Sequence, residues 1–194
     1  MPRLRLFGIR FAAILLALAC VPVATAATLA HLDTRSLVGQ SHAIVIGRVA
    51  GTHAHWNETH TRIVTDVDVD VSETLKGAAS TRVTLTQLGG EVDGVRVSVA
   101  GCAAFRPGEE ALLFVWHDAK GHAQLTGLAQ GKFEIERDAK SGEAYVQRSA
   151  PGLAVREVQR LSAVPAGARA PRLKLAELVS EIRGELASPG GSGK

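Results

Sequence analysis

The segment from residue 63 to residue 71 constrains the fold of this chain more than any other. In its sequence, IVTDVDVDV, apolar residues fall on one side of an extended backbone and acidic residues on the other. Strict alternation of this kind predicts a half-buried β-strand. The apolar set is Ile63, Val67, Val69 and Val71, and the polar set is Asp66, Asp68 and Asp70. A chain that contains such a strand needs a sheet with one face against a core and the other in water.

Other short apolar runs, separated by turn residues, predict further strands. The run LLFVW at residues 112–116 is apolar throughout, which indicates a central strand that is buried on both faces. Short strands at this spacing, with Gly, Pro and Asp between them, indicate a β-barrel or a β-sandwich. The remaining predicted strands lie near residues 43–49, 83–86, 95–99, 133–136 and 144–146.

The C-terminal part of the chain has a different pattern. Residues 149–171 are rich in Ala and Pro and predict a connector, whereas residues 172–187 repeat apolar positions with helical spacing. We expect this amphipathic helix to cap the barrel, with partner binding as the alternative use of its apolar face. Residues 188–194 are a Gly/Ser/Pro sequence that predicts a flexible tail. The apolar positions are Leu175, Leu178, Val179, Ile182 and Leu186.

The first 26 residues have the pattern of a secretory signal peptide. Three arginines precede an apolar run from Phe11 to Val23, and Ala24-Thr25-Ala26 follows it. Cleavage after Ala26 makes 27–148 the barrel domain of a periplasmic or secreted protein. A loose lipobox around Cys20 offers an alternative, in which that cysteine is lipidated and anchors the chain.

Removal of the signal peptide changes the charge balance. The full chain has 22 Lys+Arg and 19 Asp+Glu residues, and three of the arginines lie in the predicted signal. The mature chain is therefore formally neutral. Nucleic-acid binders depend on a basic surface, so this class of function is not expected. Of the two cysteines only Cys102 remains, which excludes an intramolecular disulfide and predicts a small buried thiol.

A histidine-rich stretch at residues 53–60 is the one place where the sequence suggests ligand chemistry. We interpret it as a loop, in which His53, His55 and His60 are candidate ligands for Zn²⁺ or Cu²⁺. An H-x-H pair in extended chain places both rings on one side, and His60 or Glu58 is then a candidate third ligand. The simpler interpretation is a solvated loop with no bound metal.

The same stretch contains the candidate binding residues Trp56, Asn57 and Glu58. An exposed tryptophan is a frequent anchor in protein interfaces, although a tryptophan that covers one end of the barrel is an equal alternative. No sequence motif indicates catalysis, and we expect no enzyme activity. The Asp66-x-Asp68-x-Asp70 triplet lacks the glycine and glutamate of a calcium-binding EF-hand loop.

Several short sequence segments along the chain are similar to those of a known family. In order they are SHAIVIGRVAG, TDVDVDVSETLKG, TRVTLTQLGG, FRPGEEALLFV and LAQGKF, between Ser41 and Phe133. This part of the chain resembles the netrin-like (TIMP-like) branch of OB-fold domains. The resemblance implies a small, closed or partly open antiparallel barrel with helices packed beside it.

The resemblance also implies protein binding, including inhibition of metalloproteases by an N-terminal cysteine. The predicted mature N-terminus is Ala27 and the family's disulfides are absent, so no family site residue carries over. We therefore expect an exported, non-catalytic module that binds another exported protein through loops at one end of a barrel. A periplasmic metal-binding protein is the alternative, and a protease-inhibitor-like domain is a lesser one.

Overall fold

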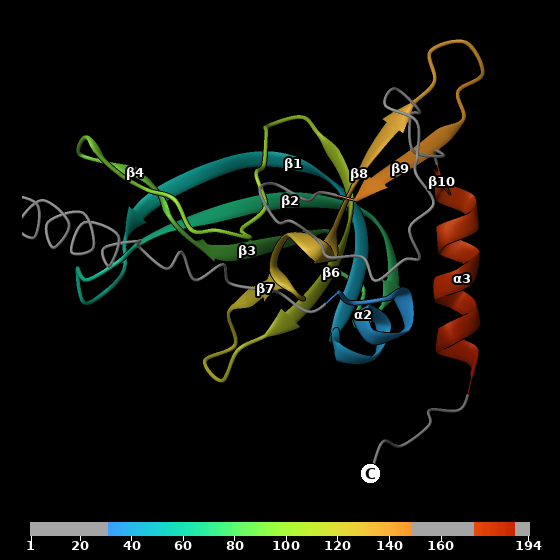
Figure 1. Ribbon diagram of the computed structural model, residues 1–194, viewed down its shortest axis with the longest axis horizontal. Coiled ribbons are helices and arrows are strands. Elements are labelled where there is room, and N and C mark those ends of the chain that lie inside the picture. The colour runs from blue at the N-terminus through green and yellow to red at the C-terminus, as the bar shows by residue number, and fades with distance from the viewer. Residues whose placement is uncertain (1–30, 149–172, 189–194) are drawn as a thin grey trace, which may run out of the picture.

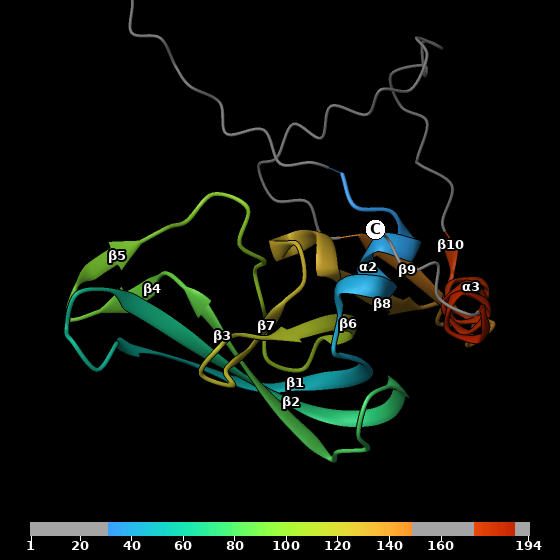
Figure 2. The same cartoon turned by 90° about the horizontal axis from the view of Figure 1, so that it is seen from below.

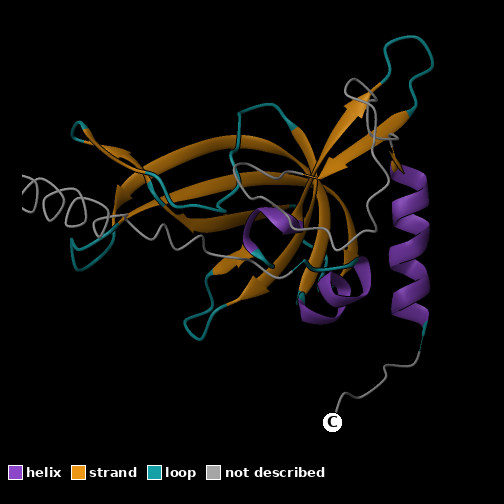
Figure 3. Cartoon of the chain, in the orientation of Figure 1, coloured by secondary structure: helices purple, strands orange, loops and turns teal. Residues whose placement is uncertain are grey.

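The computed structural model describes residues 31–148 and 173–188 (Figure 1). The predicted signal peptide, the lipidation alternative at its cysteine, the connector and nearly all of the C-terminal tail lie outside these residues. The described part is mostly β-structure with a C-terminal helix, as Figure 3 shows, and this confirms the predicted fold class.

Ten strands and three helical segments make up the described chain. The strands are β1 (Ala43–Trp56), β2 (Ile63–Lys76), β3 (Arg82–Leu88), β4 (Gly90–Val92), β5 (Val95–Val97), β6 (Glu110–His117), β7 (Ala123–Leu125), β8 (Lys132–Arg137), β9 (Ala144–Arg148) and β10 (Leu173–Lys174). The helical segments are α2 (Thr34–Gln40), the 3₁₀ turn η1 (Leu128–Gly131) and α3 (Leu175–Ala187).

Five strands close into a barrel. The order of pairing is β1–β2–β3–β7–β6, and β6 pairs with β1 to complete the ring. Closure depends on a short parallel contact between β3 and β7, with Leu85 opposite Ala123. The other pairings in the ring are antiparallel. A closed five-stranded barrel of this kind is OB-like, and the predicted barrel is confirmed.

Strand β6 joins the barrel to a second group of strands. One of its edges pairs with β1. Its other edge pairs with β8 over residues 110–113 and with β7 over residues 115–117. The sheet therefore continues from β6 through β8 and β9 to β10, outside the ring.

Strands β1 and β6 separate two hydrophobic cores, which explains their continuous apolar sequences. Alternate residues point into the barrel, where Val45 and Leu113 pack with Val67 and Val69 of β2. The residues between them point outward and are covered by the helices. This outer layer includes Ile44, Ile46, Leu112, Phe114, Leu37 of α2 and Leu178 and Ile182 of α3.

The alternation in β2 is confirmed side chain by side chain. Val67 and Val69 are fully buried and Ile63 is nearly so, while Val71 is partly buried. The aspartates lie on the outer face, opposite polar residues of β3. Thr86 donates a hydrogen bond to Asp66, Thr84 donates to Asp68, and Arg82 forms an ion pair with Asp70.

Helix α2 is capped by a side chain, and helix α3 begins later than predicted. The Asp33 side chain caps α2 by accepting a hydrogen bond from the backbone N–H of Ser36 at 2.8 Å. Helix α3 starts at residue 175, rather than 172, because Leu173 and Lys174 extend the sheet by pairing with β9. No helix in the described part of the chain is long and apolar enough to cross a lipid bilayer.

A turn at Asp93-Gly94 connects β4 and β5 into a hairpin. Both residues have positive φ, 52° and 77°, as a tight two-residue hairpin turn requires. The hairpin forms a separate two-stranded sheet beside the barrel (Figure 2). Its apolar side chains are not part of the main core, since Val95 is 46% and Val97 is 40% exposed.

The same substitution at two valines should change the free energy of unfolding by different amounts in the barrel core and in this hairpin. Val69→Ala should lower the free energy of unfolding by about 1–3 kcal/mol, because it leaves a cavity among packed side chains. Val97→Ala should change it by no more than about 0.5 kcal/mol, because that residue is 40% exposed and belongs to neither core. Chemical denaturation of both variants measures the difference. Equal losses would mean that the hairpin packs against the core.

Candidate functional site

A polar groove of about 470 Å³ lies on the outer face of the barrel. The β1–β2 turn and the β6–β7 turn form two of its walls, and the outward side chains of β2 and β3 form its base. These segments are far apart in the sequence and come together only in the folded barrel. Side chains that line the groove include His55, Glu58, Arg62, Asp66, Lys120 and His122.

One asparagine holds the β1–β2 turn in shape. The Asn57 side-chain oxygen accepts hydrogen bonds from the backbone N–H groups of Thr61 at 2.8 Å and Arg62 at 3.0 Å. Its side-chain nitrogen donates to the hydroxyls of Thr59 and Thr61. The turn is therefore preorganised by its own polar side chains, and Asn57 contributes to the groove mainly as a positioning residue.

One aspartate has the same role in the β6–β7 turn. Asp118 accepts backbone hydrogen bonds from Lys120 at 2.8 Å and His122 at 2.9 Å. Its second oxygen accepts from His122 Nδ1 at 3.1 Å and from Gln124 Nε2 at 3.2 Å. Partial desolvation alone would raise the pKa of Asp118, but the hydrogen bonds from His122 and Lys120 outweigh it and lower the pKa.

His55 lies between two hydrogen-bond acceptors at the edge of the groove. Its Nδ1 is 2.9 Å from the Trp56 carbonyl oxygen and its Nε2 is 3.0 Å from Asp66 Oδ2. Only the protonated imidazole donates from both nitrogens. The Trp56 carbonyl, and after it the Asp66 carboxylate, raise the pKa of His55 above its ordinary value of 6.5.

The raised pKa predicts a pH-dependent contribution to stability. The His55 pKa is higher in the folded protein than in the unfolded chain. Its contribution is therefore complete below the unfolded pKa and is lost as pH rises through the folded pKa. The wild type should be more stable than His55→Gln in mildly acidic solution, and this gap should close in mildly alkaline solution.

Denaturation at several pH values tests this prediction, with an NMR titration of the His55 ring as the direct measurement. The His55 side chain is 39% exposed, so the gap should be small. A ring that titrates at or below the ordinary histidine value would contradict the assignment.

Charges of both signs line the groove. Arg62 and Lys120 supply cations, and Glu58, Asp66 and Asp118 supply anions. Leu88, which is 44% exposed, adds an apolar side chain to the wall. The adjoining residue, Gly89, lies directly against the backbone of Val97 in the β4–β5 hairpin. The hairpin packs over the inner face of the β1–β2 pair, near Ala54, Ile63 and Thr65, whereas the groove lies on the outer face of that pair.

The predicted histidine-rich loop at residues 53–60 is only partly a loop, which corrects the sequence interpretation. Strand β1 continues to Trp56, because residues 51–56 pair with residues 63–68 of β2. His53 and His55 therefore lie on a strand, and their rings stack with centroids 5.7 Å apart. The expectation that the H-x-H pair points to one side holds.

The third proposed metal ligand does not join this pair. His60 lies in the β1–β2 turn and stacks on Trp56, with ring centroids 6.4 Å apart. Within residues 31–148 and 173–188, no three His, Cys, Asp or Glu side chains are grouped to hold a metal ion. Binding of Zn²⁺ or Cu²⁺ by His53, His55 and His60 thus has no assembled site in the described chain.

The other sequence candidates are placed as follows. Asn57 and Glu58 line the groove, whereas Trp56 is half-buried at the end of β1 and is not part of the lining. Cys102 is also half-buried, and desolvation raises its pKa, which makes the thiol less reactive.

The sequence interpretation missed the β6–β7 side of the groove, namely Asp118, Lys120, His122 and Gln124. A usable indication was present, since Asp followed by Gly three residues later, directly after the central strand, is a turn pattern. Nothing local indicated that this turn meets the β1–β2 turn.

Comparisons with known proteins do not assign this chain to a family. The chain matches no model of a known protein family, and a search among curated proteins finds no significant relative.

Proposed function

We propose that this protein is an exported, non-catalytic module that binds another protein through this groove. The observation that carries the proposal is the convergence of two turns, each held rigid by one side chain, on a single groove. Asn57 locks the β1–β2 turn and Asp118 locks the β6–β7 turn. Preorganised turns lose little conformational entropy when a partner binds.

The chemistry of the surface favours a polypeptide partner. Interfaces between proteins combine polar groups with an apolar centre. Here the mixed charges of the groove lie beside the exposed side chain of Leu88. Nucleic acid would require a surface that is basic throughout, and Glu58, Asp66 and Asp118 do not provide one.

Fold analogy supports the same face. In OB folds the loops between strands 1–2 and 4–5, with the face of strands 2–3, commonly bind ligands. Counted along the chain, β6 and β7 are the fourth and fifth strands of the barrel. Membership of the netrin-like branch, which the sequence phrases suggest, is part of this proposal and would also favour a protein partner.

Site-specific photo-crosslinking tests the proposal. A photoreactive residue at Glu58 or at Lys120, which lie on opposite walls of the groove, should crosslink to the same discrete protein in cell-envelope extracts. The same residue at Lys140, in the exposed β8–β9 turn, is the matched control and should give no such product. Excess unlabelled protein should compete for the product.

The outcomes separate this function from its alternatives. Equal crosslinking from Lys140 would mean non-specific contact and would overturn the proposal. The absence of any discrete product from both groove positions would do the same. A product whose yield requires added Zn²⁺ would favour the metal-binding alternative.

Export is part of the proposal and has its own test. The mature protein should begin at Ala27, because Ala24-Thr25-Ala26 has the small residues that signal peptidase requires. N-terminal sequencing of material recovered from the envelope or the medium gives the result. A lipid-modified Cys20 would instead identify an anchored protein, and an intact Met1 would contradict export.

A further inference from the structure

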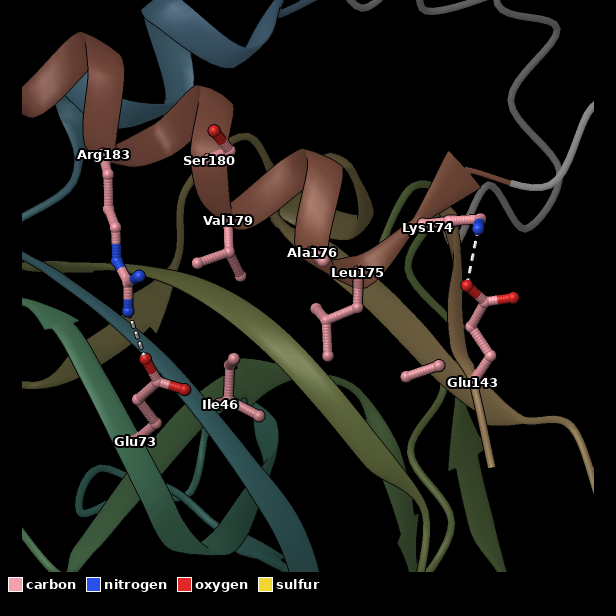
Figure 4. A pocket seen from close by; sticks show the side chains of 10 residues that line it. Ile46, Glu73, Glu143, Lys174, Leu175, Ala176, Val179, Ser180 and Arg183 are labelled. Carbon is pink, nitrogen blue, oxygen red and sulfur yellow. Dashed lines mark hydrogen bonds and ion pairs between the residues drawn. The ribbon is translucent and has the colours of Figure 1, made fainter. Parts of the chain in front are cut away.

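A second cleft, of about 480 Å³, lies between α3 and the outer face of the barrel (Figure 4). Its centre is apolar and its two ends are charged. Ile46 of β1 and Ala144 of β9 form one side, and Leu175 and Val179 of α3 form the other. In Figure 4, Leu175 and Val179 point from the helix toward the strand that carries Ile46.

The cleft is open because α3 uses only part of its apolar face for packing. Leu178 and Ile182 are fully buried in the outer layer. Leu175 and Val179 pack against the same layer but stay partly buried, so they keep apolar surface toward the cleft. Apolar surface in a concave site is favourable for a ligand to cover.

Each charged end of the cleft holds one ion pair. At one end Lys174 donates to Glu143, which also accepts a hydrogen bond from the Tyr145 hydroxyl. At the other end Arg183 donates from Nη2 to Glu73 Oε1 at 2.9 Å. A guanidinium has five N–H donors, and this is the one hydrogen bond of Arg183 among the residues that the structure describes.

We propose that this cleft binds a small anionic amphiphile, such as a fatty acid. The apolar body lies between α3 and Ile46, and the carboxylate accepts hydrogen bonds from Arg183. The planar guanidinium can hold a second carboxylate beside Glu73, because its donors form a fork. This site is separate from the groove and does not depend on the function proposed for it.

Calorimetric titration of the full chain with decanoate tests the proposal. Arg183→Gln should weaken binding about two- to fivefold, the effect of losing an ion pair at a side chain that is 63% exposed. Lys174→Gln is the matched control at the other end and should have little effect. Glu73→Gln should strengthen binding, because it frees the guanidinium. Decanol should bind more weakly than decanoate and should not respond to Arg183→Gln.

A second pair of variants tests the position of the apolar body. Val179→Phe fills the cleft and should abolish binding of both ligands. Glu181→Phe adds the same bulk on an exposed helix position outside the cleft and should not affect it. Circular dichroism and thermal melting identify any variant that fails to fold.

Several results would overturn the proposal. They are no binding of decanoate to the wild type, equal binding of decanoate and acetate, and equal losses for Arg183→Gln and Lys174→Gln. Binding that survives Val179→Phe in a folded protein would place the ligand elsewhere.

Discussion

Replacement of Lys132 with methionine should lower the free energy of unfolding by about 3–5 kcal/mol, the usual cost of breaking a buried ion pair from one side. Lys132 is the first residue of β8, and its side chain has no exposed surface. Its Nζ lies 2.6 Å from Glu109 Oε1 and donates a hydrogen bond to the Ala104 carbonyl oxygen. The cation also lies over the Phe105 ring, 4.6 Å from its centroid.

The free energy of unfolding falls because the substitution removes the partner of a poorly solvated carboxylate. The Glu109 side chain is only 15% exposed, and among the described residues no donor is aligned with its Oε1, so the charge of Lys132 compensates it. Lys132 also donates to Glu134 Oε1 at 3.3 Å, but that carboxylate is 38% exposed. Methionine keeps the apolar stem and removes the cation. The carboxylate and the Ala104 carbonyl then remain in a poorly solvated position without their partner.

Urea denaturation of three variants measures this effect. Lys132→Met should be much less stable than the wild type, and Glu109→Gln should be moderately less stable. The double variant should be more stable than Lys132→Met, because the uncompensated charge is gone. If the losses of unfolding free energy in the two single variants add up to the loss in the double variant, the two side chains do not stabilise the fold as a pair.

The parts of the fold that sequence predicted well are those whose pattern is local. The central strand β6 is apolar over LLFVW because both of its faces are buried, one in the barrel and one under the helices. The alternation in β2 likewise arises because one face of the strand is in solvent and the other is in the barrel core. The helical stripe in α3 predicted Leu178 and Ile182 as buried residues.

The parts that sequence missed depend on pairing between distant residues. Strand β7 has three residues, too few for a period to show, and exists because Ala123 meets Leu85 and Leu125 meets Val115. Strand β1 continues through His53 and His55 although that segment has no clear alternation, because β2 pairs with it along its full length.

The candidate site shows the same division. Glu58 and Asn57 were found from the unusual composition of their turn, but the groove needs the β6–β7 turn as well. The two turns are about sixty residues apart in the chain. Barrel closure brings them together, and no local pattern encodes that closure. The exposed valines of β5 show that alternation can predict a strand without predicting its sheet. The pattern did not reveal that β5 lies outside the main sheet.

Replacement of Phe114 with alanine should also cost about 3–5 kcal/mol, because it deletes a large side chain from a filled space. Phe114 is fully buried in the outer layer and packs against the Phe133 ring, with centroids 5.8 Å apart and planes inclined by 55°. Leu178 and Ile182 of α3 belong to the same cluster. Equilibrium denaturation measures the loss, and Phe114→Leu should recover much of it by refilling the space.

The position of the loss in the structure distinguishes the two cores. Phe114→Ala should raise hydrogen exchange in α3 more than Val69→Ala does, because Phe114 packs in the layer beneath the helix whereas Val69 points into the barrel. Val69→Ala should instead weaken protection in β2 and β3, next to its own cavity. If both variants lower the protection of α3 equally, the barrel interior and the outer layer form one cooperative unit. The division of the core by β1 and β6 would then have no energetic meaning.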